Sequence, residues 1–325
     1  MKLASLFTGA GGLDLGFEKA GFHVVWANEY DPTIWETFEY NFPKTKLDRR
    51  SVVEISHEDV PSVDGIVGGP PCQSWSEAGA GRGIKDKRGQ LFFDYIRLLK
   101  KKQPKFFLAE NVSGILHPKH ANAFRNIIKA FEEAGYVISW KLLNANDYGV
   151  PEDRLRVIIV GYHKKLKKKF AFPEPQQYKP VLKDVIYDLP MAKPAKDKNK
   201  TNGDILEIPN HEYMHGGFST MYMSRNRVRS WDEPSFTIQA GGRHAPIHPQ
   251  APKMKFVSQN ERIFLPGKEH LYRRLSVREC ARIQTFPDDF IFKYRDVADG
   301  YKMIGNAVPV NFAFYLAKKI MSDLK

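Results

Sequence analysis

The sequence predicts an α/β fold, with a mixed, mostly parallel sheet in one domain and a second, smaller irregular domain. Up to about residue 170, short apolar runs alternate with helical patterns, which is typical of parallel strands joined by helices. From about 172 to 270 the chain is rich in Pro, Gly, Asn, Arg and aromatic residues and lacks a long periodic run. We therefore expect a first domain over 1–171 that is completed by 301–325, a small irregular domain over 172–270, and a connecting segment over 271–300.

Apolar runs place the expected strands at 3–7, 23–28, 65–69, 105–109, 137–143 and 156–161. Asp31 and Pro32 suit a helix start, as cap and first-turn residue. Helical stripes cover 90–102 and 120–134, and Gly135 suits the end of the second of these helices. Ser276 and Glu279 have the spacing of a capping box, and 311–324 reads as an amphipathic helix.

The chain of 325 residues has a formal net charge of +13, which predicts an acidic partner, with nucleic acid as the first candidate. The alternative is a basic surface that serves solubility alone. Cys72 and Cys280 are the cysteines, too few for a disulfide framework, so a reducing compartment is expected. No stretch approaches 18 apolar residues. We expect no membrane contact and a cytoplasmic location.

A glycine-rich turn follows the first expected strand, over the residues Phe7, Thr8, Gly9, Ala10, Gly11, Gly12, Leu13 and Asp14. Glycines at such a turn let the backbone approach a ligand, and an acid at the end of the second strand, here Glu29, can bind a ribose diol. Asp14 occupies the place of the third glycine of the dinucleotide motif, where a carboxylate suits a pyrophosphate poorly. A cofactor with an adenosine but no phosphates, such as S-adenosylmethionine, avoids this conflict.

A thiol follows the expected strand at 65–69, in the stretch Gly68-Gly69-Pro70-Pro71-Cys72-Gln73-Ser74-Trp75. The prolines fix the backbone in front of Cys72, and a glycine-rich basic segment comes after it. Cys72 is therefore a candidate nucleophile beside a segment able to close over a substrate. The alternative is a buried cysteine at the end of a strand. Cys280 lies on an expected helix face with Ile283 and is assigned to the core.

Three further stretches follow in order: Glu110-Asn111-Val112, Glu152-Asp153-Arg154-Leu155-Arg156 and Gly305-Asn306-Ala307-Val308-Pro309. With the glycine turn and Pro70-Pro71-Cys72-Gln73, they resemble the ordered motif set of the DNA (cytosine-5) methyltransferases over essentially the whole chain. The sequence departs from that set at Glu152, where the family has Gln. The family's acid for the adenine amino group aligns near Ser51, three residues after Asp48, so either of these residues is a candidate for that contact.

The resemblance implies a Rossmann-like domain that binds S-adenosylmethionine and methylates C5 of a flipped-out cytosine in duplex DNA. It implies a covalent bond from Cys72 to C6, Glu110 as the acid at N3, and Arg154 and Arg156 as clamps on that carboxyl and on O2. No metal is implied. The implied cofactor-binding residues are Phe7, Gly9, Ala10, Gly11, Gly12, Leu13, Glu29, Tyr30, Pro71, Leu91, Asn306, Ala307 and Val308.

Arginines outside these motifs are candidates for DNA contacts. Arg225, Arg227 and Arg243 suit bidentate pairing with guanine, although phosphate contact alone is the alternative for each. Arg82 and Arg88, on the segment 73–90, are expected to meet phosphates as that segment closes. Within the family, the resemblance is nearest to a methylase of GGCC sites that modifies the inner cytosine.

The resemblance further implies a bacterial restriction–modification system, with a cognate endonuclease as functional partner and a monomeric methylase. Two other functions stay open at this point. One is an RNA (tRNA) cytosine-5 methyltransferase on the same scaffold. The other is a DNA-binding homologue without catalysis, although Cys72, Glu110 and Arg154 are all present.

Overall fold

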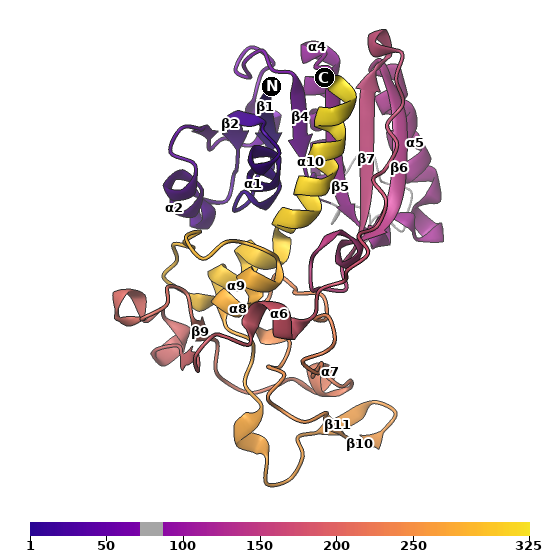
Figure 1. The fold of residues 1–325 in the computed structure, drawn as a ribbon. Coiled ribbons are helices and arrows are strands. Elements are labelled where there is room, and N and C mark those ends of the chain that lie inside the picture. The colour runs from indigo at the N-terminus through magenta and orange to yellow at the C-terminus, as the bar shows by residue number, and fades with distance from the viewer. Residues whose placement is uncertain (72–86) are drawn as a thin grey trace.

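The computed structural model describes residues 1–71 and 87–325, with the backbone alone at 87–90. A seven-stranded sheet dominates the larger part of the molecule (Figure 1), in the order β3-β2-β1-β4-β5-β7-β6. Its strands are β1 (Lys2–Leu6), β2 (His23–Asn28), β3 (Lys46–Asp48), β4 (Gly65–Gly68), β5 (Phe106–Val112), β6 (Tyr136–Asn144) and β7 (Leu155–His163).

Strand β7 is the antiparallel member of this sheet. It runs against both β5 and β6, whereas β1 pairs in parallel with β2 and β4, and the pairs β2–β3 and β4–β5 are also parallel. The predicted mixed, mostly parallel sheet is therefore confirmed. The sequence reading did not include β3, whose three residues are too few to give an apolar period.

One face of the sheet is covered by α1 (Gly12–Lys19) and by α10 (Val310–Leu324), which comes from the far end of the chain. The two helices pack closely because of Gly16: a Cβ atom there would lie 2.4 Å from the Cβ of Ala313 and 2.6 Å from the carbonyl oxygen of Val310. Phe17 of α1 and Leu316 of α10 are fully buried. The C-terminal segment thus belongs to the core of the N-terminal sheet.

The other face is covered by α4 (Lys87–Lys102) and α5 (Ala121–Glu133). Their apolar stripes bury Leu98, Leu99 and Phe131 against β4 and β5. The hydroxyl of Tyr95 lies 3.0 Å from the carbonyl oxygens of both Ile66 and Leu108. Helix α5 ends as predicted from the sequence, with Gly135 in the left-handed region at φ 107°.

The second lobe lies beyond the carboxyl ends of the parallel strands (Figure 1). Its helices are α6 (Leu182–Ile186), α7 (Thr220–Met223), α8 (Val277–Ile283) and α9 (Val297–Asn306), and its strands are β8 (Lys193–Pro194), β9 (Glu212–Tyr213), β10 (Lys255–Ser258) and β11 (Glu261–Ile263). Helices α6, α8 and α9 share an apolar core with α2 (Pro32–Asn41) of the first lobe. A smaller core around Tyr222 and Tyr272 supports α7 and the β10–β11 hairpin.

Short 3₁₀ turns connect these elements, at Val52–Glu54, Ser113–Leu116, Pro118–His120, Ala145–Tyr148, Lys164–Leu166, Asp197–Asn199, Gly203–Ile205, Gly242–His244 and Glu269–Leu271.

Both predicted helix starts are present. Asp31 accepts a hydrogen bond from the backbone N–H of Thr33 at 3.0 Å, and Ser276 and Glu279 form a reciprocal capping box. Of the helices in the described ranges, none combines the length and the apolar character that crossing a bilayer requires.

Candidate active site

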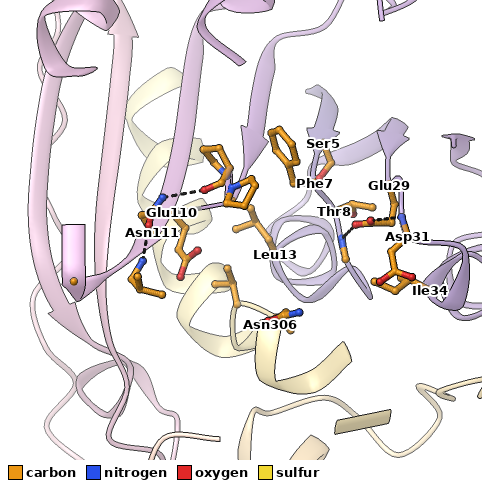
Figure 2. Close-up of a pocket in the computed structure, with 18 of the residues that line it drawn as sticks. Ser5, Phe7, Thr8, Leu13, Glu29, Asp31, Ile34, Glu110, Asn111 and Asn306 are labelled. Atoms are coloured by element: carbon orange, nitrogen blue, oxygen red, sulfur yellow. Dashed lines mark hydrogen bonds between the residues drawn. The ribbon is translucent and has the colours of Figure 1, made fainter. Parts of the chain in front are cut away.

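A pocket of about 660 Å³ opens at the carboxyl ends of β1, β2, β4 and β5 (Figure 2). This edge of a parallel sheet is where open α/β folds bind ligands. The pocket is lined by Ser5, Phe7, Thr8, Gly9, Leu13, Glu29, Asp31, Ile34, Gly69, Pro70, Pro71, Glu110, Asn111, Val112, Gly114, His117, Lys119, His120, Asn306, Ala307 and Val308.

Glu29, at the end of β2, holds the turn that follows β1. Its Oε2 accepts a hydrogen bond from the backbone N–H of Gly9 at 2.9 Å, and its Oε1 accepts one from Asp31 at 2.8 Å. Burial raises the pKa of Glu29, and the two N–H donors oppose that shift. Each oxygen keeps a free lone pair, so the fixed carboxylate can still accept hydrogen bonds from hydroxyl groups of a ligand in the pocket.

Two glycines of the turn, Gly11 and Gly12, are explained by crowding behind the pocket, whereas Gly9 is required by its positive φ of 56°. A Cβ atom at Gly11, whose φ is 89°, would lie 2.3 Å from the ring of Phe42. A Cβ atom at Gly12 would lie 2.3 Å from the carbonyl oxygen of Val308. Gly11, Gly12 and the fully buried Ala10 therefore shape the pocket from behind, whereas Phe7, Gly9 and Leu13 face it.

Asp14 lies fully buried in the first turn of α1, below this loop. The hydroxyl of Thr8 donates to its Oδ2 at 2.8 Å, while Oδ1 has no partner among the described residues. Burial raises the pKa of Asp14 to about 6. At neutral pH a buried carboxylate thus stands where a dinucleotide site would offer a helix N-terminus to phosphate, which agrees with the sequence argument against a pyrophosphate.

On the other side of the pocket, Glu110 at the end of β5 is paired with Arg156 of β7. The Nε atom of Arg156 lies 2.8 Å from Oε1 of Glu110, and both side chains are largely buried. Burial lowers the pKa of Arg156 to about 10, and the positive charge of Arg154 adds to this shift, so Arg156 is still charged at neutral pH. The site therefore presents a carboxyl that a guanidinium orients.

Asn111 links this carboxyl to the chain segment before the candidate nucleophile. Its Nδ2 donates to the carbonyl oxygen of Pro70 at 2.9 Å, and its Oδ1 accepts from the N–H of Val112 at 2.9 Å (Figure 2). Pro71 lines the same pocket. Cys72 and Arg82 lie outside the described residues, as does the side chain of Arg88 in α4.

The structure does not support the substrate clamp that the sequence led us to expect of Arg154. Arg154 is buried and does not line the pocket; Nη1 donates to the carbonyl oxygen of Ile238 at 3.0 Å, and Nη2 donates to those of Gly305 at 2.7 Å and Ala307 at 2.9 Å. Because these carbonyls and Glu152 occupy both terminal nitrogens, the guanidinium does not clamp a substrate. Arg154 thus links the backbone at Ile238 to the backbone at Gly305 and Ala307, beside the pocket.

Other predicted contacts are also displaced from the pocket lining. Tyr30 is 69 % exposed beside it, and Leu91 packs against the core of the sheet. The carboxylate of Asp48 pairs with Arg50, and Ser51 caps the 3₁₀ turn that follows. Asp31 and Ile34, which the sequence reading did not assign to the site, line the pocket instead. The helix start at Asp31 was the available signal, because it places the first turn of α2 beside Glu29.

A second group that sequence reasoning missed follows the Glu110 motif. His117, Lys119 and His120 line the pocket next to Asn111 and Val112. Burial lowers the pKa of His120, with a further contribution from Lys119. His117 lies between two short 3₁₀ turns, and Lys119 and His120 belong to the second of them; such turns have no periodic signature. Among the described residues, no group of His, Cys, Asp or Glu side chains is arranged to hold a metal ion.

The candidate DNA-reading arginines differ in what they contact. Arg225 and Arg243 are exposed in the second lobe. Arg227 instead donates from Nε to the carbonyl oxygen of Tyr222 at 2.8 Å and lies over the ring of that residue, 4.7 Å from its centroid. Burial lowers the pKa of Arg227. Arg227 is thus partly committed to the fold, whereas the other two guanidinium groups are available to a ligand.

Comparison with protein families matches residues 1–322 to the model of the C-5 cytosine-specific DNA methylases. Similar proteins include the Type II methyltransferases M.FnuDI of Fusobacterium nucleatum (59 % identical, covering 100 % of this chain and 95 % of that protein) and M.MthTI of Methanothermobacter thermautotrophicus (58 %, 100 % and 98 %).

Among solved structures, the fold is similar to that of a protein described as a prophage-encoded DNA modification methyltransferase of E. coli. The TM-score is 0.75 at 26 % identity, covering 100 % of this chain and 99 % of that one. The Entamoeba histolytica methyltransferase EhMeth shares the fold at 16 % identity, with a TM-score of 0.71 and coverage of 100 % and 99 %.

Proposed function

Because this chain belongs to the family of C-5 cytosine-specific DNA methylases, we propose that it transfers a methyl group from S-adenosylmethionine to C5 of a flipped-out cytosine in duplex DNA. The observation that carries the proposal is the oriented carboxyl of Glu110 in the pocket that also holds Glu29 and the glycine turn. Pro71, the residue before Cys72, lines the same pocket. The residues proposed as the acid and as cofactor contacts thus lie at one edge of the sheet, together with the chain segment before the proposed nucleophile.

The lining of the pocket fits S-adenosylmethionine. Glu29 and Asp31 offer carboxylates at one end, suited to ribose hydroxyls, and Phe7, Leu13 and Ile34 offer apolar surface for an adenine ring. Buried Asp14 disfavours a phosphate at the start of α1. When bound, this cofactor supplies an electrophilic methyl group on a sulfonium centre.

Carbon 5 of cytosine is a poor nucleophile, so the protein must activate the ring. We assign this to Cys72: its thiolate adds to C6, the electrons of the 5,6 double bond shift through the ring toward N3, and Glu110 protonates or hydrogen-bonds N3. C5 of the resulting enamine would take the methyl group, and S-adenosylhomocysteine would leave. Transfer of the C5 proton to a base, return of the N3 proton to Glu110 and elimination of the Cys72 thiolate would then restore the aromatic ring.

Arg156 supports this chemistry by holding Glu110 and by offering its remaining N–H groups to O2 of the cytosine. The target base has to leave the stack, since C6 and C5 cannot be approached in a closed duplex, and unstacking costs a few kcal/mol. Exposed Arg225 and Arg243 are suited to guanine, and Arg88 to phosphate.

We further propose GGCC as the site, with the inner cytosine methylated. The support is the sequence likeness to the HaeIII modification methyltransferase, carried by stretches such as 27–30, 144–150, 223–229 and 300–310. The Type II methyltransferase names of the relatives support a role in a restriction–modification system beside an endonuclease. A monomer in the bacterial cytoplasm completes this proposal.

Family membership favours DNA over RNA as substrate, and the same membership favours catalysis over DNA binding alone. The deciding experiment offers tritiated S-adenosylmethionine with either a GGCC duplex, the same duplex carrying GCGC instead, or unmodified tRNA. We expect label in the GGCC duplex alone. Label in the tRNA alone would replace the proposed function by RNA methylation, and label in none would leave a binding protein.

A further inference from the structure

Glu152 and Arg154 form a buried pair between the two lobes, beside the pocket but outside its lining. Glu152 is 0 % exposed and Arg154 is 1 % exposed. Oε1 of Glu152 lies 3.3 Å from Nη1 of Arg154. Burying both charges costs solvation, which the pair recovers only through good hydrogen bonds to its surroundings.

These surroundings are backbone groups of two distant segments. The N–H of Ile238 donates to Oε1 of Glu152 at 2.6 Å, and Nη1 of Arg154 donates to the carbonyl oxygen of the same Ile238 at 3.0 Å. Both peptide groups of Ile238 are therefore held by one ion pair. The segment is fixed further by the N–H of Asp153, which donates to the carbonyl oxygen of Ser235 at 2.9 Å.

The other end of the pair holds the cofactor side of the pocket. Nη2 of Arg154 donates to the carbonyl oxygens of Gly305 and Ala307, at 2.7 Å and 2.9 Å. These residues flank Asn306, and both Asn306 and Ala307 line the pocket. The two segments also touch directly, since a Cβ atom at Gly305 would lie 2.3 Å from the backbone nitrogen of Ala240.

The exposed side chain next to this anchor is Gln239, between the buried Ile238 and the half-buried Ala240. A ligand that moves the backbone at Gln239 must strain the hydrogen bonds of Ile238, and with them the position of the Arg154 guanidinium. That guanidinium fixes the position of the 305–307 loop through its two hydrogen bonds. The pair thus connects the 235–240 segment of the second lobe to the wall of the pocket through hydrogen bonds at both ends.

We propose that Glu152 and Arg154 are positioning residues that couple DNA binding at the 235–240 segment to cofactor binding at the 305–308 loop. The inference rests on the proposed function, because it takes duplex DNA and S-adenosylmethionine as the ligands. It replaces the substrate clamp expected of Arg154 from the sequence by an action through the backbone of both segments.

The test measures the dissociation constant of S-adenosylhomocysteine by calorimetry, with and without a saturating GGCC duplex. For the unmodified protein we expect the duplex to tighten binding by about 5- to 150-fold, the usual range for coupled sites. In R154K one ammonium cannot replace a fork that reaches Glu152 and three carbonyls, so the ratio of the two constants should fall to near one. The KM of R154K for DNA should be higher than that of the unmodified protein.

A matched control is R278K. Arg278 is also fully buried and donates to the carbonyl oxygens of Pro209, Pro287 and Phe290, but it does not line the pocket, and among the described residues it makes no hydrogen bond to the segments 235–240 and 305–308. Both variants should lose thermal stability, yet R278K should keep the full coupling ratio. This comparison separates a coupling role from a merely structural one.

E152Q gives a second variant in case R154K does not fold. It keeps an oxygen for the N–H of Ile238 but loses the charge that orients Arg154, so we expect a ratio between that of the unmodified protein and one. A full ratio in R154K, or in E152Q if R154K is unfolded, would overturn the inference. So would a ratio of one in the unmodified protein while both ligands bind, and failure of both to bind would instead overturn the proposed function.

Discussion

The Nε atom of Arg156 lies 2.8 Å from Oε1 of Glu110, and this pair joins β7 to β5 at the edge of the sheet where the pocket opens. The antiparallel course of β7 brings the start of β7 opposite the end of β5, with Arg156 registered against Val112. The sheet topology therefore fixes the geometry of the acid and its partner.

Removal of Arg156 tests this pair. R156A leaves Glu110 without its partner and removes donors from O2 of the cytosine, so we expect kcat to fall by about 10²–10³-fold, as when one preorganised donor is lost. R156K keeps the charge but loses the planar fork and should recover part of the rate. R49A removes an exposed pair with Glu39 and should leave single-turnover methylation unchanged. Unchanged turnover in R156A would contradict the assigned role.

Glu29 can be tested through cofactor affinity. Its oxygens accept the N–H groups of Gly9 and Asp31, so in E29Q the amide NH₂ must face one of these donors. E29Q also replaces a charged acceptor of the ligand hydroxyls by a neutral amide. Losing a hydrogen bond to a charged group costs about 1.5–3 kcal/mol, equivalent to roughly 10- to 150-fold weaker binding of S-adenosylhomocysteine in calorimetry. E36Q, on the exposed side of α2, is the control. Equal affinity of both variants would argue against Glu29 as a cofactor contact.

The buried carboxyl of Asp14 predicts a pH dependence of stability. Its pKa is raised by burial from 3.8 to about 6 in the folded chain. The folded state therefore binds the proton more tightly than the unfolded state, and this stabilisation is complete below about pH 4 and is lost as the pH rises through about 6.

D14N removes this titration. The difference in free energy of unfolding between the unmodified protein and D14N should shift by on the order of 2–3 kcal/mol against the unmodified protein between about pH 4 and pH 7. Urea unfolding across that range measures it, and other carboxyls cancel because both proteins contain them. A difference that stays constant with pH would show that Asp14 titrates normally.

The arginines of the second lobe should separate into two classes. R225A and R243A remove exposed guanidinium groups, and for a base-reading arginine we expect a loss of about 1–3 kcal/mol at one base pair with relaxed specificity there. R227A should instead lower the melting temperature, because Arg227 donates to the carbonyl of Tyr222. Binding to GGCC duplexes with single substitutions measures the first effect. Uniform weakening across all duplexes would mark Arg225 and Arg243 as phosphate contacts.

Much of the sheet could be predicted from the sequence, because β2, β6 and β7 are long apolar runs and the helix caps at Asp31 and Ser276 are local signals. The turn after β1 was predictable because its glycines are also a local signal. The three-residue β3 could not be predicted, since it is a strand only through its pairing with β2 and has no apolar period of its own.

The role of Arg154 could not be predicted from its motif. Its partners at Ile238 and Gly305 lie 84 and 151 residues further along the chain, so only the folded structure shows where the side chain is used. His117 and Lys119 reach the pocket from irregular turns, for which neither period nor spacing gives a signal. Local patterns thus located the site, while long-range contacts decided the task of each side chain.

The central claim is that the protein methylates the inner cytosine of GGCC through a covalent bond between Cys72 and C6. Bisulfite sequencing of plasmid DNA from hosts that express the unmodified protein or C72S tests it most directly, because one experiment reports both the site and the base. We predict that the inner cytosine of every GGCC resists conversion with the unmodified protein and is converted with C72S. Equal protection by C72S, or protection at other cytosines, would contradict the account.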